Sequence, residues 1–255
     1  MKASFIKKLW IITVTVSSTL AICFLVFYKR LTGTYERKNA DGVLRWWSGV
    51  LLGAAGVTWE VHDAHNAAVK PGRPHIIMMN HRSYYDIPLS FAALPGSIRM
   101  LAKKEFFKVP IWGKGMKAAE FISIDRNDHE QALKDLDEAR ILMQSGIVLW
   151  LAPEGTRSRS GKLQEFKKGG FMLALQTGAI IIPVGIRGSE TILPPDTFDF
   201  VLGRKIEVYV GEPIDAALYG SGQRDTLMKD VRQVIKGLCG EGEVVGRAGI
   251  EPATH

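Results

Sequence analysis

The first long hydrophobic run of the chain covers residues 9–28, which include no charged side chain. As an α-helix this run is about 30 Å long, enough to cross the hydrocarbon core of a bilayer. Trp10 and Tyr28 stand near its ends, where aromatic side chains favour a membrane interface. Lys29 and Arg30 follow directly and no small-residue cleavage site is visible, so the pattern favours a retained anchor over a cleaved signal peptide. Five Ser and Thr residues within the run leave open whether it spans the bilayer or inserts shallowly.

A second apolar segment covers residues 43–57 and carries one charge, Arg45. Its 15 residues are too few for an easy span. Trp46 and Trp47 suit the headgroup depth of an interfacial helix, but the same pattern also fits the first buried helix of a globular domain. Together the two segments predict an N-terminal, membrane-associated helical hairpin within residues 1–57.

Beyond this hairpin, residues 58–240 alternate short apolar runs with amphipathic stretches. Core strands are predicted at 75–79, 98–102, 121–125, 147–151, 180–186 and 205–210. Helices are predicted from Ile87 onward and at 111–119, 128–145, 169–177 and 224–238. This alternation predicts an α/β fold with a largely parallel central sheet flanked by helices. Residues 241–255 show no periodicity, and a disordered tail is expected there.

The composition narrows the choice of partners. The net charge of +7 at pH 7 suits an anionic membrane surface and anionic substrates. No zinc-finger spacing, aromatic RNA-binding motif or helix-turn-helix pattern is present, so nucleic acid is not an expected partner. Cys23 and Cys239 are not expected to pair, which fits a reducing compartment. His62 and His65 lack a third ligand nearby, so a polar turn and no metal site are expected there.

The most informative chemical pattern is His81 with Asp86 five residues downstream, between a predicted strand and a predicted helix. Asp86 could accept a hydrogen bond from one imidazole nitrogen and leave the other free to take a proton, as in the base half of a catalytic triad. No Gly-x-Ser-x-Gly elbow occurs and neither Cys has a suitable setting, so the base is expected to act on a substrate hydroxyl. The spacing alone also fits an Asp that caps a helix.

Further charged groups follow other predicted strands. Residues Glu154, Gly155, Thr156 and Arg157 come after the run 147–151, and Arg157 offers two parallel donors to a phosphate. Lys104 and Arg126 stand beside the strands predicted at 98–102 and 121–125. Taken alone, these groups also fit solvated turns and surface ion pairs.

The order of these blocks resembles the signature of the glycerophospholipid acyltransferases, most closely of the lysophosphatidic acid (1-acylglycerol-3-phosphate) acyltransferases. The resemblance covers roughly residues 46–215 and rests on Asn80-His81-x4-Asp86, Lys104-Glu105-Phe106 to Asp125-Arg126, Pro153-Glu154-Gly155-Thr156-Arg157-Ser158, and Ile182-Pro183-Val184. It implies that His81 is the general base and Asp86 its partner. It also implies that the acceptor's glycerophosphate is bound by Arg126, Glu154, Gly155, Thr156 and Arg157, with Lys104 as a weaker phosphate contact.

The resemblance implies a membrane-bound enzyme that moves an acyl group to the sn-2 hydroxyl of lysophosphatidic acid, giving phosphatidic acid without an acyl-enzyme. Acyl carrier protein or CoA would carry the acyl group as a thioester co-substrate, and no cofactor is expected. Because such donors are cytosolic, the catalytic domain is expected to face the cytoplasm from the inner membrane.

Two positions depart from the family pattern: Glu120 stands where Gly is usual, and Ala152 where Phe is usual. They leave open another acceptor, such as glycerol-3-phosphate or another lysophospholipid. They also leave open a lipid-binding protein that docks on a membrane without turnover, and a lipid hydrolase remains a further alternative.

Overall fold

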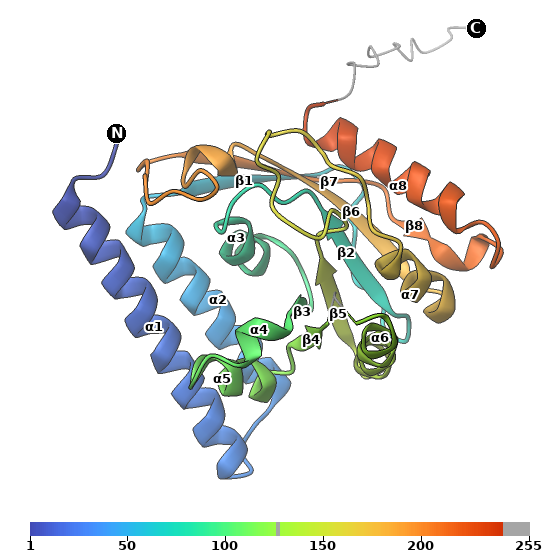
Figure 1. The fold of residues 1–255 in the computed structure, drawn as a ribbon, viewed down its shortest axis with the longest axis horizontal. Helices are drawn as coiled ribbons and strands as arrows, with labels where there is room; N and C mark the ends of the chain where they lie inside the picture. Colours follow the sequence, from blue (N-terminus) through green and yellow to red (C-terminus); the bar gives the residue numbers. More distant parts are fainter. Residues whose placement is uncertain (126–127, 242–255) are drawn as a thin grey trace, which may run out of the picture.

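The computed structural model describes residues 1–125 and 128–241. Within these residues, eight strands form one sheet in the order β1-β7-β6-β2-β5-β3-β4, and β8 pairs with β6. The strands are β1 (Thr58–Asp63), β2 (His75–Met79), β3 (Ser97–Lys103), β4 (Ile122–Ile124), β5 (Ile147–Leu151), β6 (Ile180–Arg187), β7 (Lys205–Val210) and β8 (Ile214–Asp215). The pairs β1/β7, β2/β5, β2/β6, β3/β5 and β3/β4 are parallel, whereas β7 and β8 run antiparallel to β6. The predicted α/β fold with a largely parallel sheet is confirmed (Figure 1).

Helices cover both faces of the sheet (Figure 1). They are α1 (Phe5–Leu31), α2 (Arg37–Ala54), α3 (Asp86–Ala93), α4 (Lys104–Phe107), α5 (Trp112–Ala118), α6 (His129–Gln144), α7 (Gly169–Thr177) and α8 (Arg224–Leu238), with short 3-10 turns η1 (Ser189–Thr191) and η2 (Ala216–Leu218). One core cluster joins the sheet to α1, α2 and α3, and a second joins it to α6, α7 and α8.

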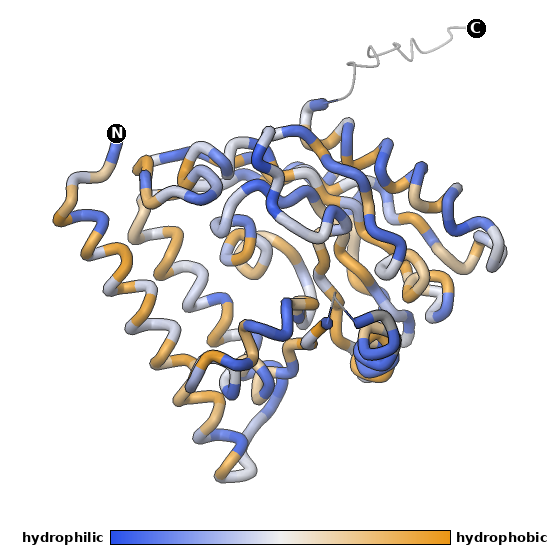
Figure 2. Tube along the Cα trace, viewed as in Figure 1, coloured by the Kyte–Doolittle hydropathy of each residue, from blue (hydrophilic) through white to orange (hydrophobic). Residues whose placement is uncertain are grey.

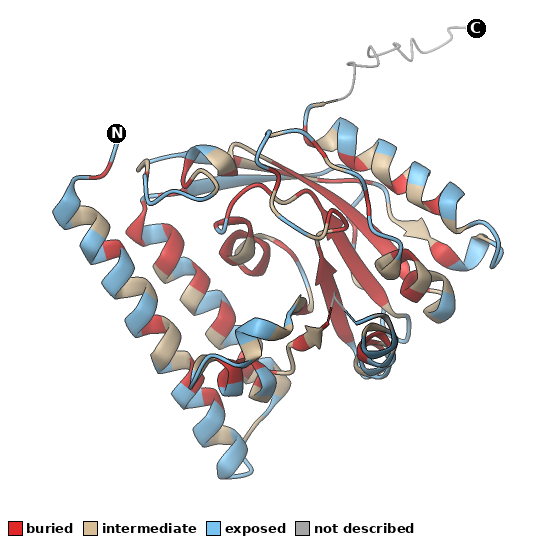
Figure 3. Cartoon of the chain, viewed as in Figure 1, coloured by how far each residue is buried: buried red, intermediate tan, exposed pale blue. Residues whose placement is uncertain are grey.

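The central strands explain why the sheet is buried on both sides. All five residues of β2 are buried, and so are all five of β5. Because successive strand side chains point to opposite faces, Ile77 and Met79 enter the first core cluster while Ile76 and Met78 enter the second. Figure 3 shows this continuous burial along the middle of the sheet. Strands buried on both faces are nearly all apolar, and the sequence therefore located these two strands correctly.

The helical hairpin is present, with longer helices than predicted. Helix α1 starts after Ser4, whose side chain accepts the Lys7 backbone N–H at 3.3 Å, and it continues through Lys29 and Arg30 to Leu31. Good helix formers at its ends extend it beyond the uncharged run. Helix α2 begins at Arg37 rather than at residue 43.

Helix α1 is largely apolar along its length (Figure 2). Its exposed large side chains include Phe5, Leu9, Phe24, Phe27 and Leu31. Within the described residues, α1 is the one helix long and apolar enough to cross a membrane, which by itself is weak evidence for membrane insertion.

Both ends of α1 are attached to the globular domain. Near the start, Lys8 forms an ion pair with Asp199 at 2.7 Å, and Lys2 forms a β-bridge with Val201. Near the end, Arg30 Nε donates to the Ala118 carbonyl at 2.9 Å. The helix therefore lies along the domain over its whole length (Figure 1).

The polar turn expected around His62 and His65 is found only in part. His62 lies on the edge strand β1 and stacks on Tyr209, with 4.5 Å between ring centroids, whereas His65 lies in the turn after this strand. The helix expected at 111–119 is confirmed as α5, which starts at Trp112 because the left-handed φ of 66° at Ile111 interrupts a helix. A separate short helix, α4, precedes it.

Candidate active site

The charged blocks lie at one edge of the sheet because their strands run parallel. His81 follows β2, Glu154 follows β5 and Lys104 follows β3, and these three strands are neighbours in the order β2-β5-β3. Ligands of open α/β sheets bind outside the carboxyl ends of the strands. Groups that are more than 70 residues apart in the chain, such as His81 and Glu154 (a separation of 73), thus become neighbours.

His81 and Asp86 form the expected hydrogen bond, with 2.8 Å between Nδ1 and Oδ2. The imidazole side chain keeps 13% of its surface exposed, whereas Asp86 is fully buried. The edge of the ring meets Trp150, with 5.8 Å between ring centroids. This arrangement orients the ring through Nδ1 and leaves Nε2 available to take a proton.

Asp86 Oδ2 also accepts the backbone N–H groups of Arg82 and Ser83, at 2.7 and 2.8 Å. One carboxylate oxygen therefore receives three hydrogen bonds. The other, Oδ1, is buried and has no hydrogen-bond partner among the described residues. Asp86 is the first residue of α3, and the N-cap is Tyr85, with no side-chain capping bond. The Asp86 carboxylate accepts from residues before the helix, so the alternative of a helix-capping Asp is wrong.

The backbone of His81 is held from both sides. Its N–H donates to Glu154 Oε1 at 3.0 Å, and its carbonyl accepts the Ser158 N–H at 2.8 Å. The preceding Asn80 is buried and exchanges two hydrogen bonds with the Ile186 backbone on β6, at 2.9 and 2.7 Å. These bonds fix the loop that carries the imidazole.

Glu154 is only 2% exposed and bridges two loops. Its second oxygen accepts the Gln164 N–H at 2.9 Å, so it connects the His81 loop to residues 155–164. Burial raises the pKa of Glu154 above its ordinary value, although the N–H bonds from Gln164 and His81 act in the opposite direction. The structure thus places Glu154 beneath the site as a support of both loops.

Arg157 lies in the same loop, with its guanidinium 3.8 Å above the ring of Tyr84. Its Nη2 is 3.4 Å from Asp196 Oδ1, and the side chain is 16% exposed. Thr156 is exposed, and Gly155 turns the chain with a φ of 76°. A guanidinium held flat on a ring and partly open to solvent is well placed to bind a phosphate.

Lys104 follows strand β3, which is two strands from β2 in the sheet. Lys104 pairs with Asp125, and the hydrogen bond that it donates to this carboxylate raises the lysine pKa. Arg126 lies outside the described residues. Ala152 packs against the core cluster that contains Trp150.

Glu120 occupies a backbone position suited to glycine, with a φ of 67°. Its carboxylate accepts hydrogen bonds from Arg37 at 2.9 and 3.1 Å and from Tyr35 at 3.1 Å, and lies 3.8 Å from buried Arg99. Burial raises the Glu120 pKa, but the neighbouring donors and positive charges outweigh it and leave the pKa below its ordinary value. This residue connects the hairpin to the sheet rather than lining the His81 edge.

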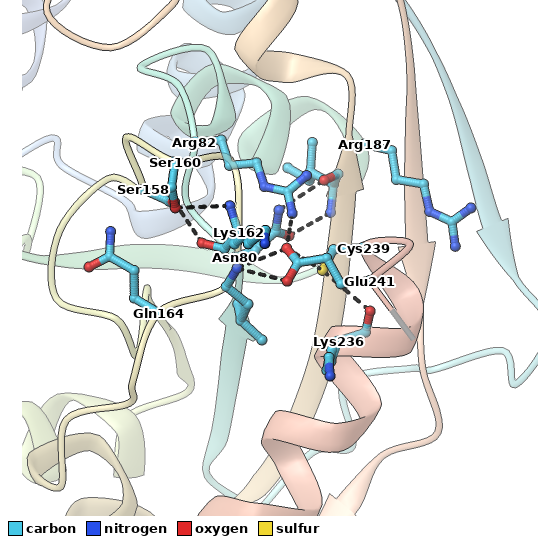
Figure 4. Close-up of polar contacts among 12 residues, drawn as sticks. Asn80, Arg82, Ser158, Ser160, Lys162, Gln164, Arg187, Lys236, Cys239 and Glu241 are labelled. Carbon is cyan, nitrogen blue, oxygen red and sulfur yellow. Dashed lines mark hydrogen bonds and ion pairs between the residues drawn. The ribbon is translucent and has the colours of Figure 1, made fainter. Parts of the chain in front are cut away.

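The site also receives a group from the residues just after α8. Glu241, after α8, forms an ion pair with Arg82 and accepts the Leu163 N–H (Figure 4). Glu241 was the first residue of the expected tail, and residues 242–255 lie outside the described residues. Sequence reasoning missed Asn80, Tyr84 and Glu241 as parts of the site, although the first two stand beside His81 in the quoted motif.

Chemically, the arrangement offers an oriented imidazole with a partly exposed cation nearby. It can accept a proton from a hydroxyl and hold an anionic group. Within residues 1–125 and 128–241, no group of three His, Cys, Asp or Glu side chains is placed to hold a metal ion.

Residues 59–187 match the family model described as Acyltransferase, and the chain belongs to that family. The chain is 30% identical over 162 residues to 1-acyl-sn-glycerol-3-phosphate acyltransferase LPAT1, chloroplastic, of Arabidopsis thaliana. The matched residues make up 64% of this chain and 44% of that relative. The 1-acyl-sn-glycerol-3-phosphate acyltransferase alpha of Homo sapiens is 33% identical over 130 residues, 51% of this chain and 45% of the relative. The chain thus spans less than half the length of these relatives.

The fold is similar to a solved one. The crystal structure of the 1-acyl-sn-glycerophosphate (LPA) acyltransferase PlsC from Thermotoga maritima superposes with a TM-score of 0.75 at 24% identity. It covers 91% of this chain and 93% of that one. The hairpin and the sheet therefore belong to one known architecture.

Proposed function

We propose that the protein transfers an acyl group from a thioester, carried by acyl carrier protein or CoA, to the sn-2 hydroxyl of lysophosphatidic acid. The observation that carries the proposal is the His81–Asp86 hydrogen bond of 2.8 Å at the sheet edge that also presents Arg157. The names of the relatives support the choice of acceptor.

In the proposed reaction, His81 Nε2 takes the proton of the acceptor hydroxyl as its oxygen attacks the thioester carbonyl. The C–O bond forms, the C–S bond breaks, and the leaving thiolate takes the proton back from the imidazolium. Asp86 stabilises the imidazolium between the two transfers. A thioester needs no metal for this attack, and no acyl-enzyme forms.

Binding of the acceptor would depend on its phosphate. Arg157 is already oriented by Tyr84, so little side-chain freedom is lost when a phosphate binds. Arg126 and Lys104 are proposed as further contacts, and Gly155 and Thr156 as the backbone and hydroxyl beside them. Holding hydroxyl, base and thioester together can lower the barrier by up to about 7–11 kcal/mol.

The membrane association is part of the proposal. The exposed apolar face of α1 and the net charge of +7 suit an anionic bilayer surface. Because both ends of α1 contact the same domain, we propose that the helix lies within one leaflet. The sheet edge would then face the cytoplasmic side of the inner membrane, where the thioester donors are.

The test is an acceptor panel with purified full-length protein, measured as thiol released from acyl-CoA or acyl carrier protein. Thiol release is expected with lysophosphatidate. Much weaker release is expected with glycerol-3-phosphate or other lysophospholipids. In His81→Ala, transfer should be almost abolished while binding to anionic vesicles persists. Turnover of His81→Ala at the wild-type rate would refute the base role. Thiol release without any acceptor would favour a hydrolase, and no release with any acceptor would favour a binding protein.

A further inference from the structure

The end of helix α8 reaches the loop that carries the proposed base. Glu241 lies just after this helix, and its carboxylate pairs with the Arg82 guanidinium. Both carboxylate oxygens also accept the Leu163 N–H, at 2.8 and 2.9 Å. Figure 4 shows Glu241 directed from the end of α8 toward Arg82.

Arg82 is held at two points. Its backbone N–H donates to Asp86 Oδ2, the same oxygen that receives the His81 ring. Its side chain is 8% exposed, so its charge needs a partner that is also in the interior. Within the described residues, its Nε has no hydrogen-bond partner, and Glu241 is the one carboxylate paired with its guanidinium.

Leu163 belongs to the loop that presents Arg157. Its neighbour Gln164 donates a backbone N–H to Glu154, which also holds the His81 N–H. Two carboxylates therefore bridge the same pair of loops: Glu154 between His81 and Gln164, and Glu241 between Arg82 and Leu163. Glu154 belongs to the active-site motif, whereas Glu241 comes from the residues just after α8.

Helix α8 is itself fixed where Glu241 leaves it. Arg187 on β6 donates to the Leu238 and Gly237 carbonyls at 2.7 and 3.2 Å. Gly240 turns the chain with a φ of 82°, and Gly185 lets the last helical turn lie against β6. The carboxylate is thus presented from a rigid element rather than from a loose end.

We propose that Glu241 is a positioning residue for acyl transfer. Through Arg82 and Leu163, it fixes the position of the loop that carries His81 relative to the loop that carries Arg157. The proposal rests on the function proposed above. Loss of this bridge would misplace both the imidazole and Arg157, so it should affect both turnover and acceptor binding. Binding of the thioester donor should change less, because neither bridged loop is assigned to the donor.

The test compares full-length Glu241→Gln with a matched control on helix α8, Asp225→Asn, which alters an exposed carboxylate. Gln can still accept the Leu163 N–H but leaves the Arg82 charge unpaired. For Glu241→Gln we expect kcat to fall about tenfold and the KM for lysophosphatidate to rise about threefold, with the donor KM within twofold of wild type. Rates are expressed per folded molecule, well below the midpoint of thermal unfolding. Asp225→Asn should stay within twofold in every parameter.

A second variant covers the case in which Glu241→Gln folds poorly. Glu241→Asp keeps the charge with a shorter side chain, and it should fall between wild type and Glu241→Gln in kcat and in acceptor KM. The proposal is overturned if both variants keep wild-type kcat and acceptor KM, or if activity falls only in proportion to the folded fraction. A wild-type chain that transfers no acyl group to any acceptor would overturn the proposed function and this inference together. An active wild type with insensitive variants would overturn the inference alone.

Discussion

The Asp86→Asn variant tests the base most sharply, because one carboxylate oxygen receives all three hydrogen bonds. An Asn side-chain oxygen can take the Oδ2 position and still accept from His81, Arg82 and Ser83. The amide nitrogen then takes the Oδ1 position, where the described residues offer no partner. The ring orientation and its tautomer should survive, and only the negative charge is lost.

The size of the effect follows from this difference. A hydrogen bond to a charged group contributes about 1.5–3 kcal/mol and a neutral one about 0.5–1.5 kcal/mol. Losing roughly 1–1.5 kcal/mol of imidazolium stabilisation slows transfer about 5- to 15-fold. By contrast, Asp86→Ala also releases the ring and leaves two buried N–H groups unpaired, so it should cost about 10²–10⁴-fold, the full contribution of a general base.

The assay is thiol release from acyl-CoA with lysophosphatidate as acceptor. Thermal unfolding provides the control, and the buried amide nitrogen is expected to cost about 1–3 kcal/mol of stability.

Two results would refute this reasoning. A rate for Asp86→Asn within twofold of wild type would mean that the carboxylate charge is irrelevant to transfer. A fall of 10³-fold or more, as large as in Asp86→Ala, would mean that the amide nitrogen faces the ring and reverses its tautomer. That outcome would contradict the sharing of one oxygen by three donors.

Three further predictions concern the phosphate contact, the attachment of the hairpin and the packing of α8. Arg157→Ala should raise the KM for lysophosphatidate about tenfold or more with a smaller change in kcat, and an unchanged KM would count against phosphate binding there. Glu120→Gln should destabilise the fold most near neutral pH, since a carboxyl with a lowered pKa stabilises the folded state above its unfolded pKa and loses that effect as pH falls. Urea unfolding of the wild type and of Glu120→Gln at pH 7 and at about pH 3.5 measures this loss of stability. A stability difference between the two proteins that grows toward acid pH would contradict the prediction. Gly185→Ala should cost about 1–3 kcal/mol, because the added Cβ would lie 2.5 Å from the Leu238 backbone. Its unfolding midpoint should drop by about 2–4 °C per kcal/mol, and an unchanged midpoint would show that α8 can move aside.

The parts of the site that could be predicted follow strands whose residues are buried and apolar. His81 and Glu154 each come after such a strand, and parallel strands bring their carboxyl ends to one edge. The order of the motifs then sufficed to predict that the loops of His81 and Glu154 meet, whereas Lys104 pairs with Asp125.

The rest depends on contacts that leave no local pattern. Edge strand β1 is mostly exposed, so its residues show no apolar run. The Arg82–Glu241 pair joins residues 159 positions apart, and neither side chain indicates its partner by spacing. Glu120 differs from the family glycine, yet its ion pairs with Arg37 depend on how the hairpin folds back on the sheet.

The attachment of the N-terminus has a consequence for synthesis on the ribosome. Ala3 donates its backbone N–H to the Phe200 carbonyl, and the Leu202 N–H donates to Met1. At about 5–20 residues per second, roughly 10–40 s separate the emergence of these partners. During that interval the buried side of α1, which includes Ile11 and Val26, has no domain to pack against. Lipid or a chaperone can engage it first, and the hairpin must then dock onto a domain that folds later.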